Sequence, residues 1–183
     1  MASALLLIDI QNDYFPGGKM ELEGSVGASL KAREILTFFR GSNLPVIHIQ
    51  HVAAHPDANF FLAETEGVKI HPNVKPLAGE TLFQKNYPNS FRGTPLLDHL
   101  RNNNLDKLVI CGMMTHMCVD ATVRAAFDYD LDVTVVHDAC ATRTLAFKNQ
   151  TIAGAQVHGA FLSALGFIYA RVVSTEEFLR NLR

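Results

Sequence analysis

Three residues of this chain have side chains that together could perform nucleophilic chemistry, and each of them follows an apolar run. Asp9 ends the run LLLID, Lys85 follows Thr81-Leu-Phe-Gln, and Cys118 comes a short turn after KLVICG. In a doubly wound sheet the ligand crevice lies at the carboxyl ends of the strands. An acid, a cation and a nucleophile from three strands could therefore meet in one crevice, as covalent catalysis requires.

Cys118 lies in the segment CGMMTHMCVDA, between an apolar strand and a helical pattern rich in small residues. It should therefore stand at or near a helix N-terminus, where free N–H groups and the helix dipole favour a thiolate over a thiol. Cys111 and Cys140 have no motif around them and are assigned to packing. Cys118 is thus the cysteine expected to be reactive.

Each of the three residues also has a simpler interpretation. Asp9 could cap a turn by accepting hydrogen bonds from nearby backbone N–H groups. Lys85 could be a solvated lysine at the end of a strand. Cys118 could be a small buried apolar residue, as free cysteines commonly are. Residue types and positions alone leave these alternatives open.

Length, charge and cysteine content restrict the class of protein. A chain of 183 residues fits one domain, 1–183. The formal charge of −2 and the absence of a basic stripe exclude nucleic acid and anionic membranes as expected partners, which leaves a small-molecule substrate. The start, MASALLLIDIQNDY, lacks a basic n-region, contains Asp9 and is interpreted as a core strand of a cytoplasmic protein. The three cysteines should be reduced.

Apolar runs alternate with helical patterns along the chain. This alternation predicts an α/β fold, with a doubly wound, mostly parallel six-stranded sheet and helices on both faces. The strands are expected at Leu5–Ile10, Pro45–Gln50, Lys107–Cys111, Asp132–His137 and Phe167–Val173, with a further one at the run from Thr81. Helices are expected at about 25–41, 94–103, 118–128, 147–165 and 175–182, the last opening with the capping box Ser174–Glu177.

The segment from Gln50 to about Thr81 interrupts this alternation. It contains several prolines, histidines and phenylalanines and little periodicity. Connections in compact domains usually have about 4–6 residues, and a much longer one is more often functional than accidental. We expect this segment to cover a binding site.

Four blocks of sequence resemble, in order, those of the isochorismatase-like cysteine hydrolases, which include nicotinamidases, N-carbamoylsarcosine amidohydrolases and isochorismatases. The blocks are DIQNDYFPGGKM at Asp9–Met20, QKNYPNSFRGTPL at Gln84–Leu96, GMMTHMCVDATVRAA at Gly112–Ala126 and VHDACATR at 136–143. With the intervening helices, the resemblance covers about residues 3–175. It implies the Rossmann-like three-layer fold of that family.

The resemblance also implies roles for specific residues. Asp9, Lys85 and Cys118 would form a catalytic triad, in which Asp9 takes the thiol proton and later passes it to the leaving amine. Lys85 would keep both partners in register and favour their charged forms. A cis peptide bond at Met113–Met114 would aim the N–H groups of Met114 and Cys118 at an oxyanion.

Two further residues flank matched motif positions. Tyr14 and His116 are the candidates for lining the substrate pocket, although both could simply be packing residues. Since relatives of this kind commonly form dimers or tetramers, we also expect a homo-oligomer.

The chain departs from nicotinamidases at their metal site. Those enzymes have an Asp-x-His pair after the second strand, where this chain has His51 and Ala53. His48, His51, His55 and His71 could form another site, because imidazole suits Zn, Fe and Ni. In a continuous strand, however, His48 and His51 point to opposite faces. We therefore expect no metal and no cofactor; the cover segment resembles that of the metal-free members.

The leading functional hypothesis is a metal-free amidohydrolase that cleaves a C–N bond in a small ureido, carbamoyl or carboxamide compound. A vinyl-ether hydrolase of the isochorismatase type is an alternative that would need a pocket for a dicarboxylic substrate, yet basic residues are sparse, with Lys19, Lys69, Lys75, Lys85 and Arg92 the main candidates. A non-catalytic binding or redox module is the other alternative. No G-x-G-x-x-G or Walker-type loop follows a strand.

Overall fold

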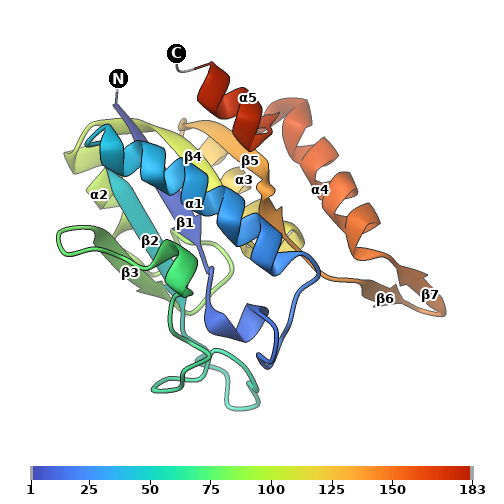
Figure 1. Ribbon diagram of the computed structural model, residues 1–183. Helices are drawn as coiled ribbons and strands as arrows, with labels where there is room; N and C mark the ends of the chain where they lie inside the picture. Colours follow the sequence, from blue (N-terminus) through green and yellow to red (C-terminus); the bar gives the residue numbers. More distant parts are fainter. Residues whose placement is uncertain (1, 182–183) are drawn as a thin grey trace.

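The computed structural model describes residues 2–181, and its central element is a six-stranded parallel sheet (Figure 1). Its strand order is β3-β2-β1-β4-β5-β8. The strands are β1 (Ala2–Ile8), β2 (Val46–His51), β3 (Thr81–Lys85), β4 (Leu105–Met113), β5 (Asp132–Ala141) and β8 (Arg171–Val173). Because every neighbouring pair is parallel, all six carboxyl ends lie at one edge of the sheet.

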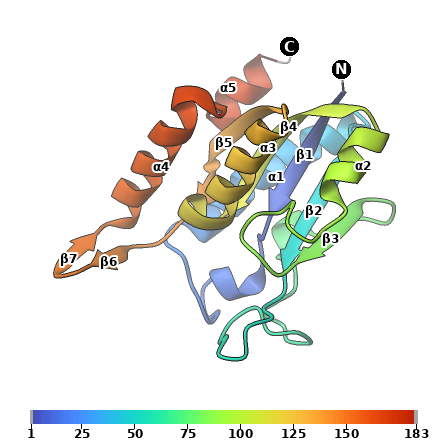
Figure 2. The same cartoon turned by 180° about the vertical axis from the view of Figure 1, so that it is seen from behind.

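Helices cover both faces of the sheet (Figures 1 and 2). Helices α1 (Ser25–Gly41) and α5 (Thr175–Arg180) lie on one face, and α2 (Leu96–Asn102), α3 (Asp120–Asp128) and α4 (Gly154–Ile168) lie on the other. Strand β1 shows the division: Leu5 and Leu7 belong to the apolar cluster beneath α1, whereas Leu6 and Ile8 belong to the opposite one. The predicted three-layer α/β class is confirmed.

Local sequence signals account for several boundaries. Helix α1 has the predicted bounds. At the start of α5, Ser174 Oγ accepts a hydrogen bond from the Glu177 N–H at 3.1 Å, and a Glu177 carboxylate oxygen accepts one from the Ser174 N–H at 2.7 Å. This is the predicted capping box, in which two side chains satisfy N–H groups that the helix leaves unpaired.

The predictions for residues 147–173 are wrong at their boundaries. The helix expected from 147 begins only at Gly154, after an antiparallel hairpin formed by β6 (Leu145–Phe147) and β7 (Gln150–Ile152), whose turn contains Lys148 at a φ of 54°. The strand expected from Phe167 is the end of α4, where Phe167 is 85% exposed, followed by the three residues of β8. A short apolar run has no periodicity that distinguishes a strand from a helix.

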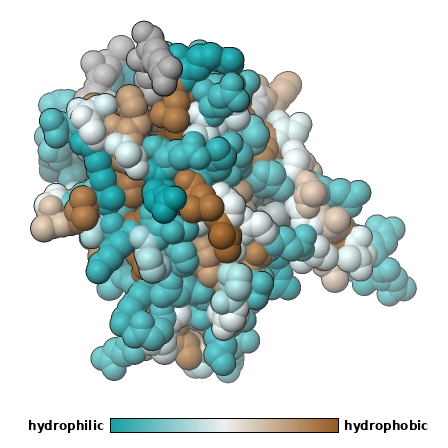
Figure 3. Space-filling model, viewed as in Figure 1, coloured by the Kyte–Doolittle hydropathy of each residue, from teal (hydrophilic) through white to brown (hydrophobic). Residues whose placement is uncertain are grey.

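The segment between β2 and β3, residues 52–80, contains one 3₁₀ turn, η2 (Pro72–Val74), and otherwise only loops. Its first part lies below the sheet in Figure 1, where the surface is mostly hydrophilic in Figure 3, and its last part returns beside β3 to the start of that strand. It is joined to the segment after β1 by an antiparallel bridge between Gln11 and Ile70. We call residues 52–80 the cover segment.

Within residues 2–181, none of the helices has both the length and the apolar composition that crossing a membrane requires.

Candidate active site

Asp9, Lys85 and Cys118 meet at the carboxyl edge of the sheet. Asp9 directly follows β1, Lys85 is the last residue of β3, and Cys118 lies in the turn after β4. Lys85 Nζ donates hydrogen bonds to Asp9 Oδ2 at 2.7 Å and to Cys118 Sγ at 3.3 Å. The three residues are 0%, 1% and 5% exposed, respectively. The sequence-predicted trio therefore forms one buried cluster, with the cation between the acid and the thiol.

Asp9 adopts a backbone conformation that side-chain-bearing residues seldom adopt. Its φ is 51°, in the left-handed region. Only one oxygen of its carboxylate, Oδ2, accepts a hydrogen bond from Lys85. The other, Oδ1, is buried and has no hydrogen-bond partner among residues 2–181. A buried oxygen without a partner requires an explanation, and a functional role is one.

The surroundings of Cys118 favour a thiol over a thiolate in the resting protein. Cys118 lies within a π-helical turn, Thr115–Val119, that precedes α3. Burial raises the pKa of Cys118, the carboxylate of Asp9 raises it further, and the charge of Lys85 only partly opposes them. Burial and the Asp9 carboxylate therefore both disfavour the resting thiolate that the sequence predicts at a helix N-terminus. The proton must be removed during the reaction.

Lys85 remains charged despite its burial. Burial lowers the pKa of Lys85, but the carboxylate charge of Asp9 and the hydrogen bonds to Asp9 and Cys118 outweigh this effect and raise it above its ordinary value. The ammonium of Lys85 therefore keeps a positive charge beside the sulfur.

The turn that contains Cys118 is fixed to two neighbouring elements. The peptide bond Met113–Met114 is cis, as predicted. Thr115 Oγ lies 3.2 Å from the Ala141 carbonyl oxygen, to which it donates, and 2.9 Å from His158 Nδ1. These contacts connect the turn to β5 and α4. The oxyanion role of the Met114 and Cys118 N–H groups stays a prediction.

Tyr14 lies beside the buried cluster, and its ring packs edge-on against Phe61 with 4.6 Å between centroids. Burial raises the pKa of Tyr14, and the carboxylate of Asp9 raises it further. Tyr14 is thus close enough to the cluster for the charge of Asp9 to affect its pKa.

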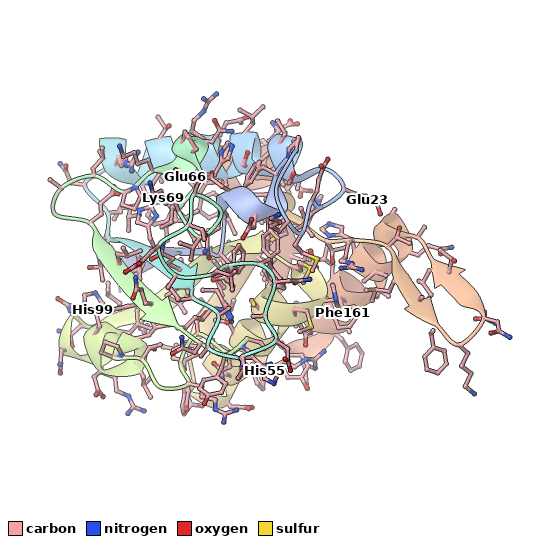
Figure 4. The ribbon with its side chains drawn as sticks, turned by 90° about the horizontal axis from the view of Figure 1, so that it is seen from below. Glu23, His55, Glu66, Lys69, His99 and Phe161 are labelled. Atoms are coloured by element: carbon pink, nitrogen blue, oxygen red, sulfur yellow. The ribbon has the colours of Figure 1, made fainter. Side chains whose placement is uncertain are left out.

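His116 lies in the same π-helical turn as Cys118. Its Nδ1 is 2.5 Å from Thr142 Oγ, and its ring meets that of Phe161 edge-on at 5.9 Å. Phe161 lies on α4, on the right of the view in Figure 4. The substrate-binding roles of Tyr14 and His116 remain predictions.

Asp13 attaches the cover segment to the rest of the site. Its carboxylate accepts hydrogen bonds from the Phe61 N–H at 2.6 Å and from the Lys19 N–H at 3.2 Å. The Asp13 N–H donates to the Gly67 carbonyl oxygen at 2.9 Å. Seen from below in Figure 4, the cover segment crosses the carboxyl ends of the strands, with Glu66 on the side of α1. Sequence reasoning did not single out Asp13.

The four histidines considered as metal ligands lie apart. His48 Nε2 is 2.9 Å from a Glu80 carboxylate oxygen, whereas His51 Nδ1 is 3.1 Å from Lys85 Nζ, so the predicted divergence of these two side chains is confirmed. His55 lies beside Asp57, and His71 stacks on Phe15 at 3.6 Å between centroids. These four side chains do not converge on one cation.

His51 belongs to the cluster around Lys85, a placement that sequence reasoning missed. The sequence suggests His51 only as a possible metal ligand, although it ends β2, which lies between β1 and β3. Its position at the same edge of the sheet was the available signal. In residues 2–181, the one group of three potential metal ligands within 4.8 Å of one another is Asp9, His51 and Cys118. The Lys85 ammonium already contacts all three.

A separate groove of about 680 Å³ lies at the amino ends of the strands. Its lining includes Arg40, Pro45, Glu80 and His99 and contains none of Asp9, Lys85 and Cys118. This groove is therefore separate from the cluster of Asp9, Lys85 and Cys118, and its volume does not identify it as the active site.

Both the sequence and the structure are similar to those of isochorismatase-family proteins. The family model described as Isochorismatase domain matches residues 3–165. YddQ of Bacillus subtilis strain 168, an uncharacterized isochorismatase family protein, is 48% identical over 98% of this chain and 100% of its own length. Maleamate amidohydrolase of Pseudomonas putida is 26% identical, with 98% of this chain and 86% of that protein covered.

A solved structure is similarly close. A protein of Oleispira antarctica assigned to the isochorismatase hydrolases superposes with a TM-score of 0.94, at 47% identity, with 98% of this chain and 96% of that chain covered. The similarity extends over the whole sheet and both helical layers.

Proposed function

Because the chain belongs to the isochorismatase family, we propose that it is a cysteine hydrolase that cleaves an amide, ureido or carbamoyl C–N bond of a small molecule through a covalent bond to Cys118. The observation that supports this most directly is the buried ammonium of Lys85, which donates to both Asp9 and Cys118. It joins a nucleophile to a carboxylate base in a site shielded from water. The name of the maleamate amidohydrolase relative is consistent with C–N cleavage.

The proposed reaction begins with proton transfer. Asp9 Oδ1, which has no other partner among the described residues, accepts the Cys118 proton as Sγ bonds to the substrate carbon. The carbonyl oxygen becomes an oxyanion, which the N–H groups of Met114 and Cys118 stabilise. When the C–N bond breaks, Asp9 returns the proton to the leaving nitrogen.

Hydrolysis of the thioester completes the cycle. Water, deprotonated by Asp9, adds to the thioester carbon, and the C–S bond then breaks. Lys85 stabilises the departing sulfur anion, which takes the proton back from Asp9. The products are an amine or ammonia and an acid, or a carbamate when the substrate is a carbamoyl compound.

Arg143 indicates which substrates this site would favour. Its guanidinium contacts Met20 Sδ at 2.8 Å, and its charge lowers the pKa of both Tyr14 and His116, although burial is the larger influence on each. It thus lies within electrostatic range of both predicted pocket residues. We propose that the substrate has one anionic group that Arg143 binds.

A dicarboxylic substrate, as vinyl-ether hydrolysis of the isochorismatase type would need, is less well matched. Lys69 is paired with Glu66, the Arg92 guanidinium lies 3.7 Å from the centre of the Tyr87 ring, and Lys85 is occupied within the cluster. These basic residues are therefore engaged elsewhere.

We also propose that the chain self-associates through α4 and the β6–β7 hairpin. The hairpin projects from the body of the molecule (Figures 1 and 2), and an isolated hairpin is marginally stable in water. Phe147, Phe167 and Ile168 are 62%, 85% and 54% exposed, and residues 154–170 contain no Asp, Glu, Lys or Arg. An uncharged face can pack against its own copy without like-charge repulsion.

Sedimentation of the purified protein tests this association. The wild type should sediment as a dimer or tetramer, and Phe167→Glu should shift it toward monomer. Leu77→Glu, at an exposed apolar residue of the cover segment, should leave the assembly intact. A monomeric wild type would exclude the proposal.

A screen of small amides, ureas and carbamates tests the catalytic proposal, with release of ammonia or amine as the readout. Cys118→Ala should abolish turnover, whereas Cys140→Ala, which removes a buried sulfur outside the cluster, should retain it. Mass spectrometry of acid-quenched reactions should find the acyl or carbamoyl group on Cys118. Equal turnover by the wild type and Cys118→Ala would exclude the covalent mechanism.

A further inference from the structure

The Lys85 ammonium has three N–H donors and three acceptors around it. Asp9 Oδ2 at 2.7 Å and Cys118 Sγ at 3.3 Å accept two of the hydrogen bonds, and His51 Nδ1 at 3.1 Å is placed to accept the third. The Lys85 side chain is 0% exposed, so solvent cannot supply an acceptor. An ammonium left with an unpaired buried N–H would be destabilised. His51 therefore completes the coordination of the buried cation.

This contact determines which nitrogen of His51 bears a proton. An ammonium can only donate hydrogen bonds, so Nδ1 must be the unprotonated, accepting nitrogen, and the proton of the neutral ring must be on Nε2. Burial lowers the pKa of His51, and the positive charge of Lys85 lowers it further, against the opposing effect of Asp9. A neutral ring with Nδ1 free is thus the form that the surroundings favour.

The backbone of His51 is held by a buried side chain. The amide of Gln11 accepts a hydrogen bond from the His51 N–H at 2.7 Å and donates one to the His51 carbonyl oxygen at 2.9 Å. It also donates to the Val68 carbonyl oxygen, in the cover segment, at 2.7 Å. The ring of Phe61 lies 5.9 Å from that of His51. The chain thus fixes the imidazole from two sides.

We propose that His51 is a positioning residue that acts through Lys85: its Nδ1 accepts the third ammonium N–H and keeps the other two directed at Asp9 and Cys118. This inference rests on the proposed function for its catalytic consequence. The spacing of Asp9, His51 and Cys118 is that of metal ligands. In this proposal the cation that the three side chains surround is the Lys85 ammonium. Without the third acceptor, the ammonium would be less stable and would stabilise the Cys118 thiolate less well.

The pH dependence of Cys118 alkylation by iodoacetamide tests this proposal without any substrate. The charged and titratable groups around the sulfur are Asp9, Lys85, His51 and Tyr14. His51→Leu removes the acceptor, whereas His51→Asn retains an acceptor oxygen near the position of Nδ1. His51→Leu should move the alkylation profile to higher pH and slow the reaction near pH 8 by about tenfold, which corresponds to about one pKa unit. The alkylation rate of His51→Asn near pH 8 should stay within about threefold of the wild-type rate, which corresponds to less than one pKa unit.

Equal rates for the wild type and His51→Leu, or equal slowing by both substitutions, would overturn the proposal. A second measurement needs no variant, in case His51→Leu fails to fold. In ¹⁵N NMR of histidine-labelled protein, His51 should be the tautomer protonated at Nε2. A proton on Nδ1 would overturn the proposal as well. Because neither readout uses hydrolysis, failure of this inference is distinguishable from absence of hydrolase activity.

Discussion

Asp9 uses one carboxylate oxygen to bind Lys85 and leaves the other unpaired. Oδ2 accepts from Lys85 Nζ at 2.7 Å, whereas Oδ1 is buried and has no partner among residues 2–181. A buried oxygen without a hydrogen bond destabilises the folded state. Its position in the cluster with Cys118 explains why this cost is tolerated: the free lone pair is the proposed acceptor of the thiol proton.

Asp9→Asn should therefore change turnover and thiol reactivity in opposite directions. Loss of the base should reduce turnover by about 100- to 10,000-fold. Alkylation of Cys118 near pH 7 should become faster, because the Asp9 carboxylate raises the pKa of Cys118 and the amide would not. Steady-state kinetics and timed iodoacetamide labelling of the same preparation measure both effects.

Lys85→Met is the matched control for that experiment. It removes the charge that lowers the pKa of Cys118, so alkylation should become slower than in the wild type. If both substitutions slowed alkylation, the proposed electrostatic balance at the sulfur would be wrong.

The same ion pair predicts a non-additive effect on stability. Removing one partner of a buried ion pair costs about 3–5 kcal/mol, since the other charge is left uncompensated. Lys85→Met should reduce the free energy of unfolding in urea by about this amount. The double variant Asp9→Asn/Lys85→Met should recover part of the loss. A double variant whose loss equals the sum of the two single losses would contradict this coupling.

The positions of Asp9, Lys85 and Cys118 after successive strands suggest from the sequence that they lie together, and the family resemblance adds their proposed catalytic roles. In a parallel sheet the residues after such strands share one edge, so Asp9, Lys85 and Cys118 could be grouped before their distances were known. The protonation state of Cys118 could not be predicted in the same way. It depends on burial and on Asp9, which is 109 residues away in the sequence and adjacent in the fold.

Two other features depended on contacts that sequence periodicity does not encode. The sequence predicts a helix over part of the hairpin at residues 145–152, because the two strands are too short to show alternation. The contact of His51 with Lys85 follows from the pairing of β2 with β3, in which these two residues are partners. This contact can be predicted only when the order of the strands in the sheet is known.

Glu80 should contribute to stability in a pH-dependent way. Burial opposes its ionisation, yet hydrogen bonds from Arg40, the Leu77 N–H and His48 lower the pKa of Glu80 to about 2. The unfolded chain, with its higher pKa, binds the proton more readily as the pH falls below about 4.5. Glu80 therefore contributes fully to the free energy of unfolding above about pH 4.5. This contribution, about 3 kcal/mol in total, is lost as the pH falls toward 2.

Urea unfolding at pH 6 and pH 3 measures this contribution. Glu80→Gln should lose about 2 kcal/mol less than the wild type between the two pH values. Glu176→Gln, at a side chain that is 86% exposed, is the matched control and should behave like the wild type. Parallel losses in all three proteins would argue against a special role for Glu80.

Arg143 should distinguish substrates by charge. Arg143→Gln removes the cation near Tyr14 and His116 and should raise KM for amides that have a carboxylate by about tenfold, equivalent to about 1.4 kcal/mol of binding. The KM for neutral amides of similar size should change little, and kcat should change little for either class. A uniform rise in KM would instead indicate a general disturbance of the pocket.

Gly67 should be required for attachment of the cover segment. A Cβ at this position would lie 2.1 Å from Asp13 Oδ1. Since the Asp13 carboxylate binds the N–H groups of Phe61 and Lys19, Gly67→Ala should displace it and break these contacts. Loss of buried hydrogen bonds to a charged group should reduce the free energy of unfolding by about 1–3 kcal/mol.

The effect of Gly67→Ala on the cover segment can be separated from a general effect of replacing glycine. Limited proteolysis should cleave residues 52–80 faster in Gly67→Ala than in the wild type, and KM should rise because a loosened cover excludes water less well. Gly27→Ala is the control: a Cβ there meets no atom within 4 Å, and the site is within α1, so helix propensity should make it neutral or stabilising. Equal cleavage rates in Gly67→Ala and the wild type would show that Asp13 does not tether this segment.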